Sequence, residues 1–212
     1  MRDTLRKDIL LYVTEKRYPH ILGTEEECVR LADIFSFSDS EKEELAVAAL
    51  LHDITKRFTT DEHVKYMEGI GKPIPKENLT FEKTLHALTG AYFAREKYPE
   101  LVNDRIFSAI YYHTTGKGNM SLFEKLLYLA DYIEPTRTFY DCVKIRERFY
   151  NAIKNAKNEN EKINVLNDTL LFSLDLTIDD LKKQGCSIHS DTIEAREYLI
   201  SNSAGTNASE NK

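Results

Sequence analysis

Apolar residues recur every three or four positions along most of the chain, which is the spacing of amphipathic helices. The first such segment covers residues 4–18, and Pro19 interrupts it. Similar patterns between chain breakers predict helices at about residues 20–35, 40–54, 61–70, 85–98, 102–113, 121–134, 145–156, 161–176 and 191–200. The pattern therefore indicates an all-α protein.

Capping signals mark several of the predicted helix starts. Ser40 with Glu43, and Ser121 with Glu124, have the spacing of a capping box, and Thr60 is expected to cap a helix between them. The run LAVAALLHDI is strongly apolar, so its helix is expected to be buried on most faces. The longest irregular stretch in the body is GKPIPKENLTFE.

The composition supports the helical interpretation. The chain has 8 glycines and 5 prolines among 212 residues, about half of the roughly 12% that these two residues average in proteins. Sandwiches, barrels and collagen-like repeats need more turns, so these classes are excluded. Residues 1–200 are expected to form one domain, because no repeat or composition shift divides them, and the small polar residues 201–212 are expected to form a disordered tail.

The formal net charge of −6 disfavours binding to a nucleic acid polymer, because proteins with that role are usually basic. A small polyanion is still allowed, since a metal ion and a few local cations outweigh distant surface charge. No apolar run reaches the roughly 18–20 residues of a membrane span, and the N-terminus lacks a secretory signal. The sparse cysteines, Cys28, Cys142 and Cys186, form no CxxC pair, which favours a reducing cytoplasm.

His52 and Asp53 stand side by side at the end of the apolar run. Burying an imidazole and a carboxylate without partners is costly, so both side chains need partners there. A divalent metal would satisfy both, and this donor set suits Fe, Mn, Co or Zn. A histidine satisfied by ordinary hydrogen bonds at a helix end is the alternative.

Two further residues strengthen the metal hypothesis. His20 lies where two predicted helices meet, and Asp131 lies within an apolar helix where a carboxylate needs a reason to be present. The alternative for Asp131 is an exposed face that it shares with Tyr128 and Glu134. Together, four side chains would form a ligand shell of two nitrogens and two oxygens, from His20, His52, Asp53 and Asp131.

The other four histidines differ in their settings. His86 begins one predicted helix and His113 ends another, and helix ends are places where functional side chains protrude. His63 has only the pattern of an exposed helical residue, so no role is expected for it. His189 precedes a helix start and is expected to form local capping contacts.

The order H…HD…H…H…D resembles the HD-domain phosphohydrolase superfamily, all-helical metal-dependent enzymes that act on phosphoesters and phosphoanhydrides. Longer strings resemble the bacterial YqeK family of symmetrical diadenosine tetraphosphatases and span residues 17–196; they are RYPHILG, LLHDITK, LHALTGAYFAREKY, IYYHTTGKGNMSLFEKLLYLADYIEPTR and IHSDTIEAR. The chain departs from that pattern at Thr24 and Thr55, where an aliphatic residue and an alanine are expected. Neither departure touches a proposed ligand.

The resemblance implies a single HD-domain helical bundle that cleaves diadenosine tetraphosphate into two ADP. It implies the same four metal ligands, with iron as the favoured metal and manganese or cobalt as alternatives. Asp53 then has a catalytic role as well, because it would orient the attacking water. The implied partner is a small dinucleoside polyphosphate.

A tetraphosphate needs local cations and hydrogen-bond donors. Lys56, about one turn after Asp53, is assigned a catalytic role at a phosphate, and a solvated helix-end lysine is the alternative. Phosphate binding is expected from six further residues, namely His86, His113, Thr114, Thr115, Lys117 and Arg137. A second metal held by the two histidines of this group is the runner-up. Tyr112 and Tyr132 are candidates for stacking on adenine or for the core.

Two other functions remain open at this level. The same ligands would serve an HD phosphohydrolase that acts on mononucleotides or in NAD metabolism. A catalytically inactive HD scaffold that senses nucleotides is less favoured, since a sensor needs no complete ligand shell. The apolar run NDTLLFSLDL is expected either to form a homodimer face or to belong to the core.

Overall fold

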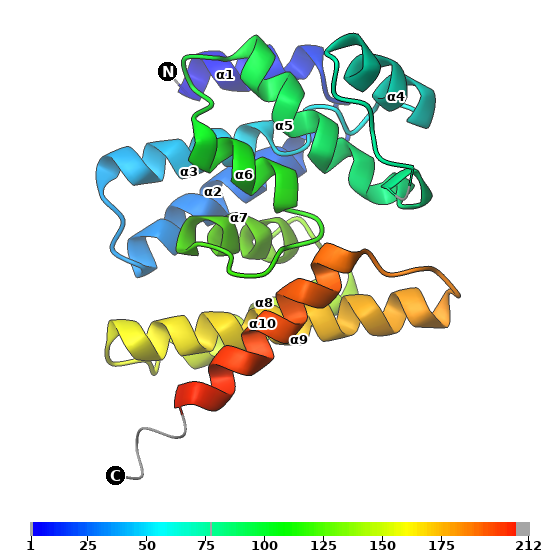
Figure 1. Ribbon diagram of the computed structural model, residues 1–212. Coiled ribbons are helices and arrows are strands. Elements are labelled where there is room, and N and C mark those ends of the chain that lie inside the picture. Colours follow the sequence, from blue (N-terminus) through cyan, green and yellow to red (C-terminus); the bar gives the residue numbers. More distant parts are fainter. Residues whose placement is uncertain (1, 77, 207–212) are drawn as a thin grey trace.

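The computed structural model describes residues 2–76 and 78–206, and these ranges contain helices and loops without any strand (Figure 1). The elements in chain order are α1 (Arg2–Asp8), η1 (Ile9–Leu11), α2 (Tyr18–Ile34), α3 (Asp39–Leu51), α4 (Thr60–Gly69), η2 (Asn78–Thr80), η3 (Glu82–Thr84), α5 (Leu85–Lys97), α6 (Asp104–Tyr112), α7 (Leu122–Ile133), α8 (Tyr140–Ile153), α9 (Glu159–Lys183) and α10 (Ser190–Thr206). The all-α prediction is confirmed.

The helices form two parts that meet at α7. Helices α1 to α7 form the larger part, and α8, α9 and α10 lie together beneath α7 in Figure 1. Helix α7 packs against α2, α3 and α6 on one side and against α8 and α9 on the other. Its Leu126, Leu127 and Leu129 are fully buried, so α7 supplies the core of both parts.

The N-terminal segment differs from the predicted helix over residues 4–18. Helix α1 ends at Asp8, a short 3₁₀ turn follows, and α2 begins at Tyr18. Pro19 stands in the first turn of α2 rather than between two helices, because that turn does not need the N–H group that proline lacks. This start places His20 one residue after the proline, in the first turn of α2.

Helix α3 begins two residues earlier than predicted. Ser38 is its N-cap and forms a capping box with Glu41, so the predicted Ser40–Glu43 box is wrong. Both pairs have the same spacing, but the earlier start places the carboxylates of Asp39 and Glu41 in the first turn, where the helix dipole favours them.

Capping boxes also mark the starts of α4 and α7. Thr59, rather than the predicted Thr60, caps α4 and forms a capping box with Glu62. The predicted box of Ser121 and Glu124 is confirmed at the start of α7. The sequence therefore located all three helix starts to within two residues.

Helices α9 and α10 test the predictions of a disordered C-terminal tail and of a homodimer face or core position for the run NDTLLFSLDL. Helix α10 continues to Thr206, so the first half of the segment predicted as a disordered tail is helical, and residues 207–212 lie outside the described residues. On α9, Leu170 and Leu174 are fully buried within the chain and belong to its core. Within the described ranges, no helix is long and apolar enough to cross a membrane.

Candidate metal centre

The four predicted metal ligands come from α2, the end of α3 and α7, and their side chains lie close together in the interior. His20 lies in the first turn of α2, His52 and Asp53 follow the last residue of α3, and Asp131 lies in the last turn of α7. His52 and Asp53 are completely buried, and His20 and Asp131 are each only 7% exposed. His52 and Asp53, at the end of the apolar helix, are therefore buried in the interior, and His20 and Asp131 face them there.

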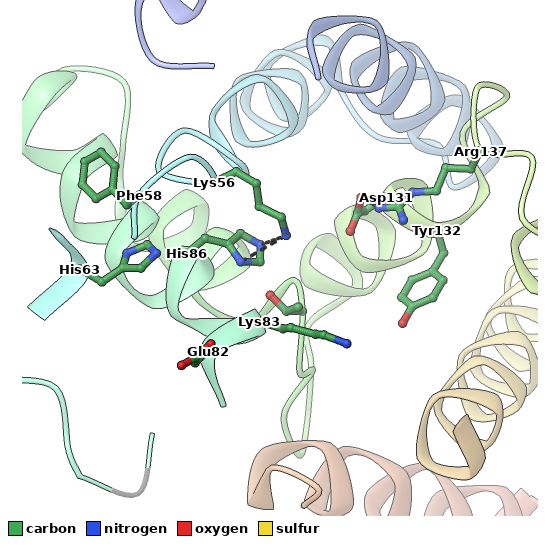
Figure 2. A pocket seen from close by; sticks show the side chains of 10 residues that line it. Lys56, Phe58, His63, Glu82, Lys83, His86, Asp131, Tyr132 and Arg137 are labelled. Carbon is green, nitrogen blue, oxygen red and sulfur yellow. Dashed lines mark hydrogen bonds and ion pairs between the residues drawn. The ribbon is translucent and has the colours of Figure 1, made fainter. Parts of the chain in front are cut away.

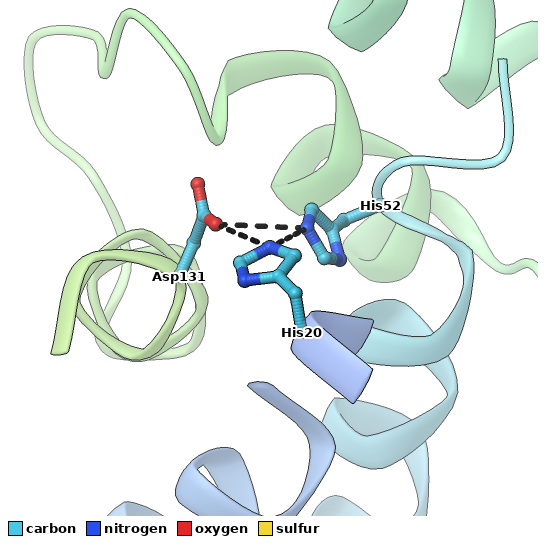
Figure 3. A group of neighbouring side chains, drawn as sticks. All are labelled: His20, His52 and Asp131. Carbon is cyan, nitrogen blue, oxygen red and sulfur yellow. Dashed lines mark hydrogen bonds and ion pairs between the residues drawn. The ribbon is translucent and has the colours of Figure 1, made fainter. Parts of the chain in front are cut away.

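Three of the four predicted ligands, His20, His52 and Asp131, have donor atoms close enough to share one ion (Figure 3), and Asp53 groups instead with His52 and His113. His20 Nε2 lies 3.4 Å from His52 Nε2 and 3.0 Å from Asp131 Oδ1, and His52 Nε2 lies 3.7 Å from the same oxygen. Asp53 Oδ2 lies 3.4 Å from His52 Nε2. Ligand atoms about 2.1 Å from a common ion lie roughly 3.0–4.2 Å apart, depending on the coordination geometry, so the arrangement of His20, His52 and Asp131 fits a metal.

Backbone contacts fix which imidazole nitrogen points at the centre. His52 Nδ1 donates a hydrogen bond to the carbonyl oxygen of Ala49 at 2.6 Å, so its Nε2 carries no proton in the neutral ring and is free as a ligand. His113, at the end of α6, repeats this arrangement with the carbonyl oxygen of Ile110 at 2.7 Å. Both histidines are thereby held in the tautomer that a metal requires.

The two carboxylate oxygens of Asp53 face different groups of histidines. Oδ2 faces the ring of His52, whereas Oδ1 lies 3.2 Å from His86 Nε2 and 3.8 Å from His113 Nε2. Oδ1 is buried and has no hydrogen-bond partner among the described residues. A buried carboxylate oxygen without a partner is costly, and a cation would supply what it lacks. His52, Asp53 and His113 form a second group of donor atoms close enough for an ion.

Two residues that sequence reasoning missed support the ligands. Glu134 is completely buried, and its Oε1 lies 3.0 Å from His20 Nδ1, so the carboxylate orients the ring of that ligand. Arg17 Nε donates a hydrogen bond to Asp53 Oδ2 at 2.5 Å. In the sequence, Glu134 shows only the spacing of an exposed face shared with Asp131, and Arg17 gives no signal beyond its place three residues before His20.

The carboxylates at the centre are held in their charged form. Burial acts to raise the pKa of Asp53, but the neighbouring His52 and His86 outweigh it and hold the pKa well below its usual value. Burial also opposes ionisation of Asp131, and Arg137 and His20 hold its pKa well below the usual value. The donor oxygens therefore keep the negative charge that metal ligation needs.

The histidines divide into two electrostatic groups. Burial acts to lower the pKa of His20, but hydrogen bonds to Asp131 and Glu134 raise it above the usual value. Burial dominates for the other pair and lowers the pKa of His86 and, further, that of His113. His86 and His113 are therefore neutral near pH 7, as ligands or hydrogen-bond partners must be.

A pocket of about 460 Å³ opens from this centre (Figure 2). Its walls are mostly polar or aromatic side chains from α4, α5, α7 and the loops between helices: Lys56, Phe58, His63, Glu82, Lys83, His86, Thr114, Asp131, Tyr132 and Arg137. Lys56 Nζ lies 2.9 Å from His86 Nε2 and 3.8 Å from Asp53 Oδ1. Three cationic side chains thus surround a space with a metal-ligand carboxylate in its wall.

The predicted phosphate-binding residues divide into those in the pocket and those outside its walls. Thr114 lines the pocket, and its buried hydroxyl has no hydrogen-bond partner among the described residues. Arg137 also lines it and donates to Asp131 Oδ1 at 2.5 Å. Thr115 instead donates to the carbonyl of Gly116, and the structure does not bring it to the pocket wall.

Tyr132 lies in the pocket wall, whereas Lys117 and Tyr112 lie outside it. Lys117 Nζ lies 2.7 Å from Glu124 Oε1 and 4.8 Å from the centre of the Tyr112 ring, so both side chains belong to a contact away from the pocket wall. Tyr132 lines the pocket, and its hydroxyl is hydrogen-bonded to Thr177 at 2.9 Å. Of the two aromatic candidates, the structure places only Tyr132 at the site.

His63 is buried, so the exposed position that its helical pattern predicted is wrong. Its ring is only 4% exposed, its Nδ1 lies 2.7 Å from the hydroxyl of Thr89, and it lines the pocket. The helical pattern failed because α5 covers a face of α4 that its own sequence shows as polar. The expectation for His189 agrees with the structure, since its Nδ1 accepts a hydrogen bond from the backbone N–H of Asp191 at the start of α10.

Comparison with known proteins gives a consistent family. Residues 17–136, just over half of the chain, match the HD domain. The chain is 35% identical over 191 residues to the symmetrical bis(5'-nucleosyl)-tetraphosphatase of Halalkalibacterium halodurans, covering 89% of this chain and 91% of that protein. It is 34% identical over 192 residues to the protein of the same name in Bacillus subtilis, covering 90% and 93%.

A solved structure supports the same fold. The crystal structure of a protein from Clostridium acetobutylicum, described as a predicted HD superfamily hydrolase involved in NAD metabolism, matches with a TM-score of 0.79 and 33% sequence identity. The match covers 95% of this chain and 98% of that one. Helices α8 to α10, which follow the matched HD residues, are therefore part of the shared architecture.

Proposed function

The chain belongs to the HD-domain family, and from this membership we propose that it is a metal-dependent hydrolase that cleaves diadenosine tetraphosphate symmetrically into two ADP. Water adds across the central phosphoanhydride. The water oxygen joins one inner phosphorus, the bond from that phosphorus to the bridging oxygen breaks, and the bridging oxygen leaves with the second ADP.

The observation that carries this proposal is the position of the metal-ligand group in the wall of a cationic pocket. Asp131 is both a candidate ligand and a wall residue, so a substrate in the pocket lies directly against the centre. Lys56, Lys83 and Arg137 contribute positive charge on three sides of the same space. A polyphosphate chain is the substrate chemistry that uses both features.

We propose His20, His52, Asp53 and Asp131 as the residues that hold the metal, with iron as the resident ion and manganese or cobalt as alternatives. A divalent cation bound there lowers the pKa of a coordinated water towards neutrality. Asp53 has the additional role of orienting the attacking water, since its carboxylate lies between the two groups of histidines. Elemental analysis of protein from its native host tests the identity of the ion.

The phosphate groups are held by residues on the pocket walls. Lys56 donates to a phosphate oxygen of the departing ADP, and Arg137 donates to the phosphates from the opposite side. Thr114 offers its unpartnered hydroxyl to the same oxygens. Lys83 extends into the pocket in Figure 2 and forms no ion pair with a described residue, so it joins this group although it was not predicted.

His86 and His113 complete the site as neutral rings. His86 lines the pocket and is assigned to the phosphates, whereas His113 donates its Nδ1–H to Ile110, so its unprotonated Nε2 acts as an acceptor or a metal ligand rather than as a donor to a phosphate. The Nε2 atoms of the two rings lie 3.2 Å apart, and both face Asp53 Oδ1. This geometry also supports the alternative that the pair, together with Asp53, would hold a second metal. The number of ions bound per chain at saturation distinguishes the two assignments.

The test is a nucleotide panel with protein loaded with Fe²⁺, Mn²⁺ or Co²⁺. We expect diadenosine tetraphosphate to yield ADP alone, measured by ion-exchange chromatography, and water labelled with ¹⁸O to place one label in half of the ADP molecules. ATP and AMP as products would contradict the symmetrical cleavage. Phosphate released from mononucleotides would favour the second candidate, a hydrolase of NAD metabolism, which the description of the Clostridium acetobutylicum structure supports.

We also propose that the protein works in the reducing cytoplasm. Cys28 and Cys142 are buried free thiols and Cys186 is exposed and free, which suits a compartment that keeps thiols reduced. Fractionation of native cells followed by immunoblotting tests this location.

A further inference from the structure

Arg146 lies on α8, outside the walls of the pocket, and its guanidinium group binds the backbone that follows α7. Its Nε donates to the carbonyl oxygen of Ile133 at 2.5 Å. Its Nη2 donates to the carbonyl oxygens of Glu134 at 2.5 Å and Arg137 at 2.8 Å. One side chain thus holds three carbonyl groups of a five-residue segment.

The carbonyl group of Ile133 needs a partner from outside the segment, whereas that of Glu134 also accepts the backbone N–H of Arg137 at 3.1 Å. The last carbonyl groups of an α-helix have no N–H partner within the helix, and α7 ends at Ile133. Pro135 cannot supply an N–H group to them either. A positive charge at a helix C-terminus is also favourable against the helix dipole. Arg146 provides both the donors and the charge.

The segment held in this way carries two residues of the site. The carboxylate of Glu134 orients His20, and it also accepts hydrogen bonds from the backbone N–H and the hydroxyl of Thr136, each at 2.7 Å. Arg137 contacts Asp131 and lines the pocket. A shift of the backbone at residues 133–137 would therefore move Glu134, which contacts His20, and Arg137, which contacts Asp131.

We infer that Arg146 is a positioning residue for the metal centre and the pocket. It fixes the segment after α7 so that Glu134 meets His20 and Arg137 meets Asp131. This inference rests on the proposed metal site but not on the identity of the substrate. It assigns to the C-terminal helices a role in the site, since Arg146 lies beyond residue 136, where the HD match ends.

The test measures metal affinity in R146K and R146Q, by competition of the protein with a chelating dye for Co²⁺. Lysine cannot reach three carbonyl groups at once, so we expect R146K to weaken binding about 10-fold and R146Q to approach 100-fold, the range typical of residues that orient ligands. The matched control is R148K, because Arg148 lies on the same helix and its guanidinium stacks on Phe172 instead. Circular dichroism confirms that each variant keeps its helices.

A double-mutant cycle with E134Q separates positioning from general destabilisation. If Arg146 acts through Glu134, the loss of affinity in R146K/E134Q is smaller than the product of the two single losses. R148K/E134Q should match E134Q alone. Unchanged affinity in R146K and R146Q, or losses that multiply, would overturn the inference. Metal affinity is measured without substrate. Its outcome therefore tests the role of Arg146 even if the protein fails to hydrolyse diadenosine tetraphosphate.

Discussion

At the scale of single residues, Asp53 is the side chain on which most of the site depends. It is completely buried, and its two oxygens face two different groups of histidines. We expect D53A to lose the metal and to lose activity by more than the roughly 10–100-fold typical of changes outside the ligand shell. D61A, which changes an exposed carboxylate, is the control. Metal content and turnover are measured together, and activity that survives in D53A would contradict the ligand assignment.

His63 gives a prediction about pH. Burial, with smaller contributions from His86 and Lys56 in the same direction and from Glu62 in the opposite one, lowers the pKa of His63 to about 4, below the roughly 6.5 of an unfolded chain. The unfolded state therefore binds the proton more tightly, so the stability from this neutral ring is complete above pH 6.5 and lost as the pH falls towards 4.

We expect H63Q, which keeps a polar partner for Thr89, to show a melting temperature that falls less steeply than that of the parent protein between pH 6.5 and 4. Differential scanning calorimetry across this range measures the slope. H189Q, at a ring that only caps α10, serves as the comparison. Equal slopes in H63Q and the parent protein would refute the assignment.

The sequence predicted the residues that form the centre but not those that support them. His52, Asp53 and Asp131 stand out because each is a polar residue in an apolar segment, and His20 because it follows Pro19 where two predicted helices meet. Glu134 gave no such signal, since it ends a helix before a proline, and only the packing of α2 against α7 makes it buried. Supporting contacts are formed between segments, so no single segment reveals them.

At the scale of helices, the approach of α2 to α7 depends on Gly23. A Cβ atom at this position would lie 2.3 Å from Oε2 of Glu134, so α2 carries a glycine where the buried carboxylate needs space. We expect G23A to displace Glu134 and weaken metal binding about 10-fold, although alanine favours a helix by about 1 kcal/mol.

Gly69, in the last turn of α4, offers the matched control. No atom lies within 4 Å of a Cβ placed there, so G69A should keep full metal affinity and be neutral or slightly stabilising. Isothermal titration with Co²⁺ and thermal melting compare the two variants. Equal metal affinity in G23A and G69A would show that the carboxylate tolerates the added methyl group.

The order of the helices followed from the sequence because it depends on local signals. The box of Ser121 and Glu124 is confirmed at the start of α7, and prolines and capping residues mark other helix ends. The start of α3 was misplaced because Ser38 and Ser40 both precede a glutamate by three residues. The packing of α8 to α10 beneath α7 was not predicted, since amphipathic faces indicate burial without naming the partner.

At the scale of the whole molecule, one ion would join α2, the end of α3 and α7. A ligand that binds only the folded state adds about 2.7 kcal/mol at 100 times its dissociation constant, or roughly 5–10 °C in melting temperature for a chain of this size. We therefore expect added Co²⁺ to raise the melting temperature by this amount and EDTA to reverse the rise. D53A should show no shift, and a shift of the same size in D53A would place the ion elsewhere.

The ligands of the centre are distant along the chain, since the first is His20 and the last is Asp131. During synthesis the N-terminal helices emerge first, and they carry three of the four ligands without the fourth. The site is complete only after α7 has left the ribosome and packed against α2, and Arg146 emerges later still. The proposed site of His20, His52 and Asp131 is therefore completed late in the maturation of the protein, only after α7 has been synthesised and packed.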